Sequence, residues 1–169
     1  MRNQTKLRST EAGFTLIELL IVMSVILILM TLAIPAMQKV TIHAHQTSAV
    51  RTLQVLNSAE GEYNGNYPQH GYACTLAQLG GNASAGPATP EAAQLIGDDL
   101  VGGNKAGYTF TIACGSKATA NNQDQYNSYT ITAVPNAVGK SGSLGYCTDG
   151  EGLIHYDPKG GTNCTELLQ

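Results

Sequence analysis

The chain has 169 residues, of which 43% are hydrophobic, 12% charged and 6% aromatic, with 19 glycines, no tryptophan and a formal net charge of -3. The length allows one domain with a core of its own. The apolar content excludes intrinsic disorder, and the acidic balance argues against a protein that binds nucleic acid through its net charge.

The charges divide the chain into unlike parts. Residues 1–13 hold three basic residues against one acidic residue, a net of +2, whereas residues 14–169 hold six against eleven, a net of -5. The charged fraction of the whole chain is about half that of a typical soluble domain. One segment with a single charged residue accounts for this low charged fraction.

That segment is residues 14–37, in which Glu18 is the only charged residue. Its apolar side chains leave no polar face, so we predict a transmembrane helix rather than an amphipathic surface helix. Twenty-four helical residues would be about 36 Å long, and a hydrocarbon core is about 30 Å thick. The basic flank places residues 1–13 in the cytoplasm by the positive-inside rule, and the chain from residue 38 onwards then lies outside.

Three interpretations of this segment compete. A removable secretory signal peptide would need an A-x-A-like site after roughly 7–15 apolar residues, and Ala33, Ala36 and Ala44 supply none. A permanent anchor with no further role leaves Glu18 unexplained, because an ionisable residue inside a span costs about 2.5–3.5 kcal/mol. The third interpretation takes Glu18 together with its neighbours.

The residues Gly13-Phe14-Thr15-Leu16-Ile17-Glu18-Leu19-Leu20 resemble the processing site of type IV pilins and of the related pseudopilins of type II secretion. The resemblance implies that a prepilin peptidase cuts between Gly13 and Phe14 and that the new N-terminus at Phe14 is methylated. It also implies that Glu18 meets the Phe14 ammonium of a neighbouring copy when the apolar helices pack together. A buried pair of this kind enforces axial register as well as attraction.

The resemblance implies a structural subunit of a type IV pilus rather than an enzyme. Its partners would be other copies in a helical filament, the prepilin peptidase, and the inner-membrane platform with its assembly ATPase, with neither a cofactor nor direct binding to nucleic acid. The precursor would lie in the bacterial inner membrane with a cytoplasmic N-terminus, and the product in a filament in the periplasm or at the cell surface. A pseudopilin of type II secretion, or a minor pilin acting as an anchored adhesion or DNA-uptake module, stays an alternative.

The segment after residue 37 is amphipathic, with one helix face formed by residues at mostly three- and four-residue steps: Val40, Val50, Leu53, Leu56, Ala59 or Glu60, and Tyr63. Residues 64–68 form a stop signal, so we expect one long helix over about 15–63. Pro35 falls inside this helix, either as a helix boundary at the membrane surface or as a flexible point. Pilins often have a proline at the matching place, and the resemblance therefore favours the flexible point.

The remaining chain predicts a small antiparallel sheet. Residues 64–107 are mainly loop, with a short helical piece over 75–79 and a helix from Thr89, as N-cap, to about Leu100. Strands are expected over 108–113, 128–134, 143–147 and 152–156. The predicted fold is α+β: a leader (1–13) that is removed, a transmembrane and assembly helix (14–37), and a headgroup (38–169) that includes the amphipathic half of the helix packed on the sheet.

The four cysteines all lie on the predicted outer side, which favours disulfides, and the sequence alone leaves three connectivities open: Cys74, Cys114, Cys147 and Cys164. We expect Cys147–Cys164 plus Cys74–Cys114. The first pairing resembles the disulfide-bounded C-terminal loop of many type IV pilins.

Three carboxylates near a predicted turn are the candidate ligands of a metal: Asp149, Glu151 and Asp157. Oxygen ligands suit Ca²⁺, and the resemblance includes the major pseudopilins, which bind calcium in the headgroup. The sequence does not fit the EF-hand loop, because Leu153 stands where an oxygen donor is needed.

Overall fold

The computed structural model describes residues 13–120 and 123–168, and of residues 32–36, 120 and 123 it describes the backbone alone. Apart from Gly13, the predicted leader therefore lies outside the described residues. The chain divides into two compact units that meet in the sequence between Met37 and Gln38. The α+β class and the helix on an antiparallel sheet are confirmed, and "headgroup" is used below for residues 38–169.

The helix α1 (Leu16–Asn66) contributes to both units. It ends three residues later than expected, and the backbone N–H of Tyr67 still donates to the carbonyl of Tyr63 at 2.8 Å. The Asn-Gly-Asn stop signal falls in the last turn, where the carbonyls have no helical partner in any case. The backbone is helical through Pro35, so a helix boundary at that residue is excluded. The Pro35 side chain is outside the described residues, and flexibility there stays a prediction.

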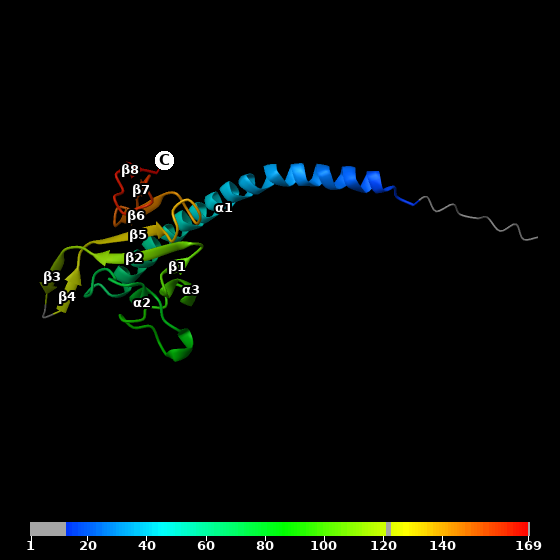
Figure 1. The fold of residues 1–169 in the computed structure, drawn as a ribbon. Helices are drawn as coiled ribbons and strands as arrows, with labels where there is room; N and C mark the ends of the chain where they lie inside the picture. Colours follow the sequence, from blue (N-terminus) through cyan, green and yellow to red (C-terminus); the bar gives the residue numbers. More distant parts are fainter. Residues whose placement is uncertain (1–12, 121–122, 169) are drawn as a thin grey trace, which may run out of the picture. The chain divides into compact units, whose positions relative to one another are not determined.

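A six-stranded antiparallel sheet forms the other layer of the headgroup, in the order β1-β2-β5-β6-β7-β8 (Figure 1). The strands are β1 (Asn104–Lys105), β2 (Tyr108–Cys114), β5 (Tyr129–Pro135), β6 (Gly145–Asp149), β7 (Ile154–Asp157) and β8 (Glu166–Leu167). A hairpin of β3 (Lys117–Ala120) and β4 (Gln123–Tyr126) is inserted between β2 and β5 and pairs separately. The four expected strands are β2, β5, β6 and β7.

The core lies between the headgroup part of α1 and one face of the sheet. The helix contributes side chains at three- and four-residue steps: Ala49, Leu53, Leu56, Ala59 and Tyr63. The sheet contributes alternate residues, including Tyr108, Phe110 and Ile112 of β2, whose intervening residues are exposed. This alternation gives β2 an inner and an outer face, as expected of a strand that covers a core on one side.

The loop between α1 and the sheet departs from prediction at one place. It contains α2 (Leu76–Leu79), η1 (Ala83–Ala85) and α3 (Asp98–Val101), so the helix expected from Thr89 to Leu100 is wrong. Thr89 and Ala92 exchange backbone hydrogen bonds in a turn instead. The N–H groups of residues 93–96 donate to carbonyls of residues 78–80. Because these donors pair with a distant segment, they are not available to a helix.

Two disulfides tie this scaffold, and they join the pairs expected from the sequence. Cys74 pairs with Cys114 across a sequence separation of 40, and Cys147 pairs with Cys164 across 17. The first links the loop after α1 to the end of β2. The second links β6 to the segment before β8.

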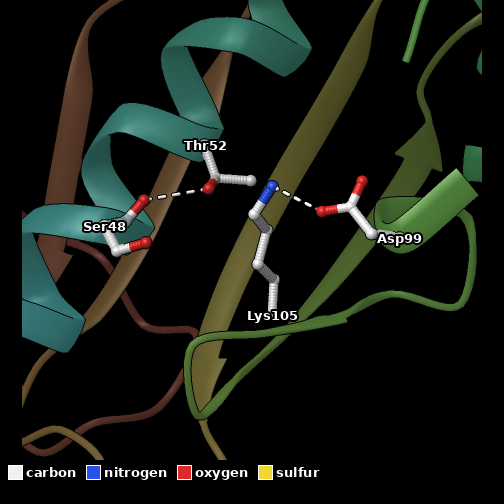
Figure 2. A network of polar contacts seen from close by, with 4 residues as sticks. All are labelled: Ser48, Thr52, Asp99 and Lys105. Carbon is white, nitrogen blue, oxygen red and sulfur yellow. Dashed lines mark hydrogen bonds and ion pairs between the residues drawn. The ribbon is translucent and has the colours of Figure 1, made fainter. Parts of the chain in front are cut away.

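One exposed ion pair joins β1 to α3: the Lys105 ammonium lies 2.7 Å from the Asp99 carboxylate (Figure 2). The same figure shows a separate contact within α1, in which the Thr52 hydroxyl donates to the Ser48 carbonyl. The side chains of the ion pair are 41% and 65% exposed, and such pairs contribute about 0–1 kcal/mol. The Lys105–Asp99 pair therefore contributes little to the stability of the fold.

The two disulfides predict unequal losses of stability. In the chain-entropy model, a closed loop of 40 residues stabilises by about 4 kcal/mol and one of 17 by about 3 kcal/mol. We expect the double variant C74S/C114S to lose more unfolding free energy than C147S/C164S. All 8 tyrosines lie in the headgroup, so tyrosine fluorescence of the detergent-solubilised chain during guanidinium unfolding measures this difference. The reverse order would contradict the loop-length argument.

Candidate processing and assembly site

The predicted cleavage site lies in the short non-helical segment before α1. Gly13, Phe14 and Thr15 precede the first helical residue, Leu16. Phe14 is 89% exposed, and a Cβ placed on Gly13 would meet no atom within 4 Å. The peptide bond between Gly13 and Phe14 is therefore accessible from outside and not held by helical hydrogen bonds, as a peptidase requires.

Glu18 lies in the first turn of α1 and folds back onto Thr15. Its Oε2 accepts hydrogen bonds from the Thr15 backbone N–H at 2.9 Å and from the Thr15 hydroxyl at 2.7 Å. The Thr15 hydroxyl oxygen in turn accepts from the Glu18 N–H at 3.3 Å. This reciprocal pair is a capping box, which satisfies two backbone donors at the helix start. The spacing Thr15-x-x-Glu18 is its sequence signal, and our sequence interpretation, which considered only the charge of Glu18, did not use it.

The apolar side chains that follow are exposed on every side of the helix. Each large apolar residue from Leu16 to Met30 is between 42% and 82% exposed. A continuous apolar surface of this kind marks contact with lipid or with another protein. It is the structural counterpart of the predicted assembly surface.

Among the described residues, no helix combines the length and the hydropathy needed to cross a membrane. The span predicted over 14–37 includes residues 32–36, whose side chains lie outside the described residues. It stays a prediction.

The three candidate calcium ligands do not converge, because Asp157 lies away from Asp149 and Glu151. Asp149 ends β6, whereas Asp157 ends β7 opposite Gly145, so the two are at opposite ends of the hairpin, about 13 Å apart along the strands. Asp157 is buried and accepts from the N–H groups of Lys159 at 2.8 Å and Asn163 at 3.2 Å. Asp149 accepts from the Glu151 N–H at 3.0 Å. The described residues contain no cluster of three metal-ligating side chains, and the carboxylates of Asp149 and Asp157 accept hydrogen bonds within turns instead.

Glu60 is an ionisable residue in an unusual environment. The sequence predicts only a helix face that includes Ala59 or Glu60, whereas the structure buries its carboxyl. Glu60 is fully buried, and its Oε2 accepts from the Ala73 N–H at 2.8 Å. Burial raises the pKa of Glu60 to about 7, and the Ala73 hydrogen bond opposes this rise. No local sequence pattern marks Glu60, because its burial depends on the loop that folds over it.

Comparison with known proteins identifies the N-terminal segment. A family model of the prokaryotic N-terminal methylation motif matches residues 8–34, which include Gly13, Phe14 and Glu18. The chain is 34% identical over 87 residues to the type IV major pilin protein PilE1 of Neisseria gonorrhoeae, covering 50% of the chain and 46% of that protein. The resemblance to the type IV pilin family is confirmed.

A second relative is a fimbrial protein. The chain is 39% identical over 83 residues to a fimbrial protein of Neisseria meningitidis serogroup B, covering 49% of the chain and 44% of that protein. The chain thus spans less than half the length of each of these relatives. No solved structure matches it significantly.

The capping box predicts that Thr15→Ala loosens the start of α1. Loss of a threonine cap costs about 1 kcal/mol, which corresponds to roughly a fivefold rise in local opening. Amide hydrogen exchange of residues 16–18 in detergent micelles measures it, with amides near Ser24 as the internal reference. Unchanged exchange at residues 16–18 would show that the capping box does not stabilise this end.

Proposed function

We propose that the chain is a structural subunit of a type IV pilus filament and not an enzyme. The observation that supports this most directly is the helix α1, which begins at Leu16, two residues after Phe14, and exposes apolar side chains all round as far as Met30. The named relatives are a pilin and a fimbrial protein. In a filament, the exposed apolar side chains of this helix would be buried against the same helix of neighbouring copies.

In the proposed first step, a prepilin peptidase hydrolyses the Gly13–Phe14 bond. The absence of a side chain on Gly13 allows close approach to the backbone, and the bond lies outside the helix. Hydrolysis leaves a carboxylate on Gly13 and an α-amino group on Phe14, which is then methylated. The apolar helix stays attached to the headgroup.

In the proposed second step, Glu18 exchanges partners. In the structure its carboxylate is bound by Thr15, and after cleavage the Phe14 ammonium becomes available on each neighbouring copy. Pairing of opposite charges between helices in an apolar interior fixes their relative height, because an unpaired buried charge costs several kcal/mol. The apolar side chains meanwhile exchange lipid for other helices.

This function requires the partners and places predicted from the resemblance. The precursor lies in the inner membrane with its N-terminus in the cytoplasm, where the peptidase, the platform proteins and the assembly ATPase act on it. The product is a filament in the periplasm or at the cell surface, with the headgroup facing outwards. The proposal includes no cofactor and no direct contact with nucleic acid.

Replacing Glu18 separates processing from assembly. We expect Glu18→Ala to be cut and methylated normally but to form few or no fibres, because the Phe14 ammonium would lack its partner. Electron microscopy of surface fibres together with mass spectrometry of the subunit measures both steps. A mature mass that begins at methylated Phe14 is expected for the native chain and for the variant.

Thr15→Ala is the matched control, because it removes the hydroxyl that donates to Glu18 and keeps the charge of Glu18. We expect this variant to form fibres. Normal fibres from Glu18→Ala would overturn the assembly role of Glu18, and an intact 1–13 segment in functional native protein would overturn the proposed function. Native chain that is processed but forms only a short periplasmic structure would favour the pseudopilin alternative.

A further inference from the structure

Glu60 is an acid buried in the core without a matching base. It is 0% exposed and lies on α1 between the core residues Ala59 and Tyr63. Its Oε2 has the Ala73 N–H as partner at 2.8 Å. Its Oε1 is the one buried side-chain polar atom of the described residues that has no hydrogen-bond partner. A buried carboxylate with one donor is costly, whereas a neutral carboxylic acid is much less so.

The groups around Glu60 do not offer a compensating charge. Tyr63 of α1 and Tyr129 of β5 interact with it electrostatically, and their pKa values are raised to about 12, chiefly by burial, so both are neutral near pH 7. Further out, Glu91 acts on Tyr63 and Asp149 acts on Tyr129, and both are acidic. Among the described residues no cation contributes to the pKa of Glu60.

The neighbouring hydroxyls are also engaged elsewhere. The Tyr63 hydroxyl donates to the Pro90 carbonyl at 2.8 Å, and the Tyr129 hydroxyl donates to Asn57 Oδ1 at 3.2 Å. Neither donor is available to Oε1 without breaking its own hydrogen bond. The arrangement of the groups around Glu60 therefore favours the protonated carboxyl over the ionised carboxylate.

Ala73, whose N–H donates to Glu60, belongs to a segment that contacts three parts of the headgroup. Residues 70–74 exchange backbone hydrogen bonds with β4, from the Tyr72 N–H to the Tyr126 carbonyl and from the Tyr126 N–H to the His70 carbonyl, both at 3.0 Å. The Tyr72 ring packs on Tyr129 of β5 with centroids 4.7 Å apart. Cys74 is bonded to Cys114 at the end of β2. We call residues 70–74 the latch segment.

We propose that Glu60 is a proton-controlled latch: its neutral acid holds the latch segment on α1, and loss of the proton loosens the segment. When the segment opens, water reaches the carboxyl and the ionised form is no longer penalised. The β3–β4 hairpin, which is hydrogen-bonded to the latch segment through Tyr126, loosens with it. The inference does not depend on filament formation, because every contact that carries it lies within one headgroup.

The direction of the pH dependence follows from linkage. The pKa of Glu60 is about 7 in the closed state and 4.5 for an ordinary exposed glutamate. The closed state therefore binds more protons between these values, and the latch is tightest below about pH 4.5. Opening increases as the pH rises to about 7, by roughly two orders of magnitude in total, and then levels off because both states are ionised.

Amide hydrogen exchange of Ala73 tests the proposal on the full chain in detergent micelles. Exchange is followed from about pH 4.5 to about pH 8.5 and corrected for the intrinsic chemical rate, so that the opening equilibrium remains. We expect the opening constant of the native chain to rise and level off near pH 7. We expect Glu60→Gln, which keeps an acceptor for Ala73 and cannot ionise, to show no such rise.

Two variants serve as controls. Glu62 is exposed on the same helix, and Glu62→Gln should keep the native pH dependence. His70 is the histidine of the latch segment, and His70→Asn should keep the dependence as well, since the hydrogen bond of residue 70 to β4 is made by its backbone carbonyl. A native profile that is flat, or one that survives in Glu60→Gln, would overturn the proposal, as would a dependence that disappears in His70→Asn.

The native chain also contains an internal comparison that needs no variant. We expect the rate at which a thiol reduces Cys74–Cys114 to increase with pH relative to the rate for Cys147–Cys164. The reason is that only the first disulfide includes a residue of the latch segment, Cys74. The ratio of the two rates cancels the pH dependence of the reductant. A ratio that stays constant below about pH 7 would contradict the latch, even if Glu60→Gln failed to fold.

Discussion

The headgroup depends on the contact between one face of α1 and the inner face of the sheet. The helix presents Ala49, Leu53, Leu56 and Tyr63, and the sheet presents Ile131 and its neighbours, all of them fully buried or nearly so. Burial of one such large side chain stabilises by about 1.5–3 kcal/mol. The loop elements α2 and α3 add Leu76, Leu79 and Leu100 to the same core, so the helix, the loop and the sheet cover one another. The disulfides and the exposed ion pairs add to a scaffold that this contact creates.

The same helix carries two glutamates in opposite situations. Glu18 is exposed at the helix start and has hydrogen-bond donors on Thr15, so its charge is stable there and available to a new partner. Glu60 is enclosed by the loop and the sheet and has a single donor, so its charge is disfavoured. One residue type thus supports a proposed assembly contact at one end of α1 and a proposed proton-controlled contact in the headgroup.

The parts of the fold that could be predicted are those in which local pattern and tertiary environment agree. β2 and β5 alternate apolar and polar residues, and the structure buries the apolar set. Thr75 caps α2 through the Gln78 N–H, as its position suggests. The segment after Thr89 has an equally good local signal for a helix, and it fails because residues 93–96 pair with residues 78–80. The strands β3 and β4 carry no alternation of large apolar residues and depend on each other for pairing, so the sequence gives no strand signal there.

The amino-acid sequence by itself indicated the α+β class and the resemblance to the pilin family, and it predicts a basic leader, an apolar helix, a polar headgroup and a cleavage site after Gly13. These features are carried by residues adjacent in the chain, so their chemistry needs no fold to be recognised. Only the tertiary structure decided that Asp149 and Asp157 lie at opposite ends of a hairpin and that Glu60 is buried beneath Ala73. Both depend on the register of strands and on the path of a loop, and therefore on contacts between residues that are distant in the sequence.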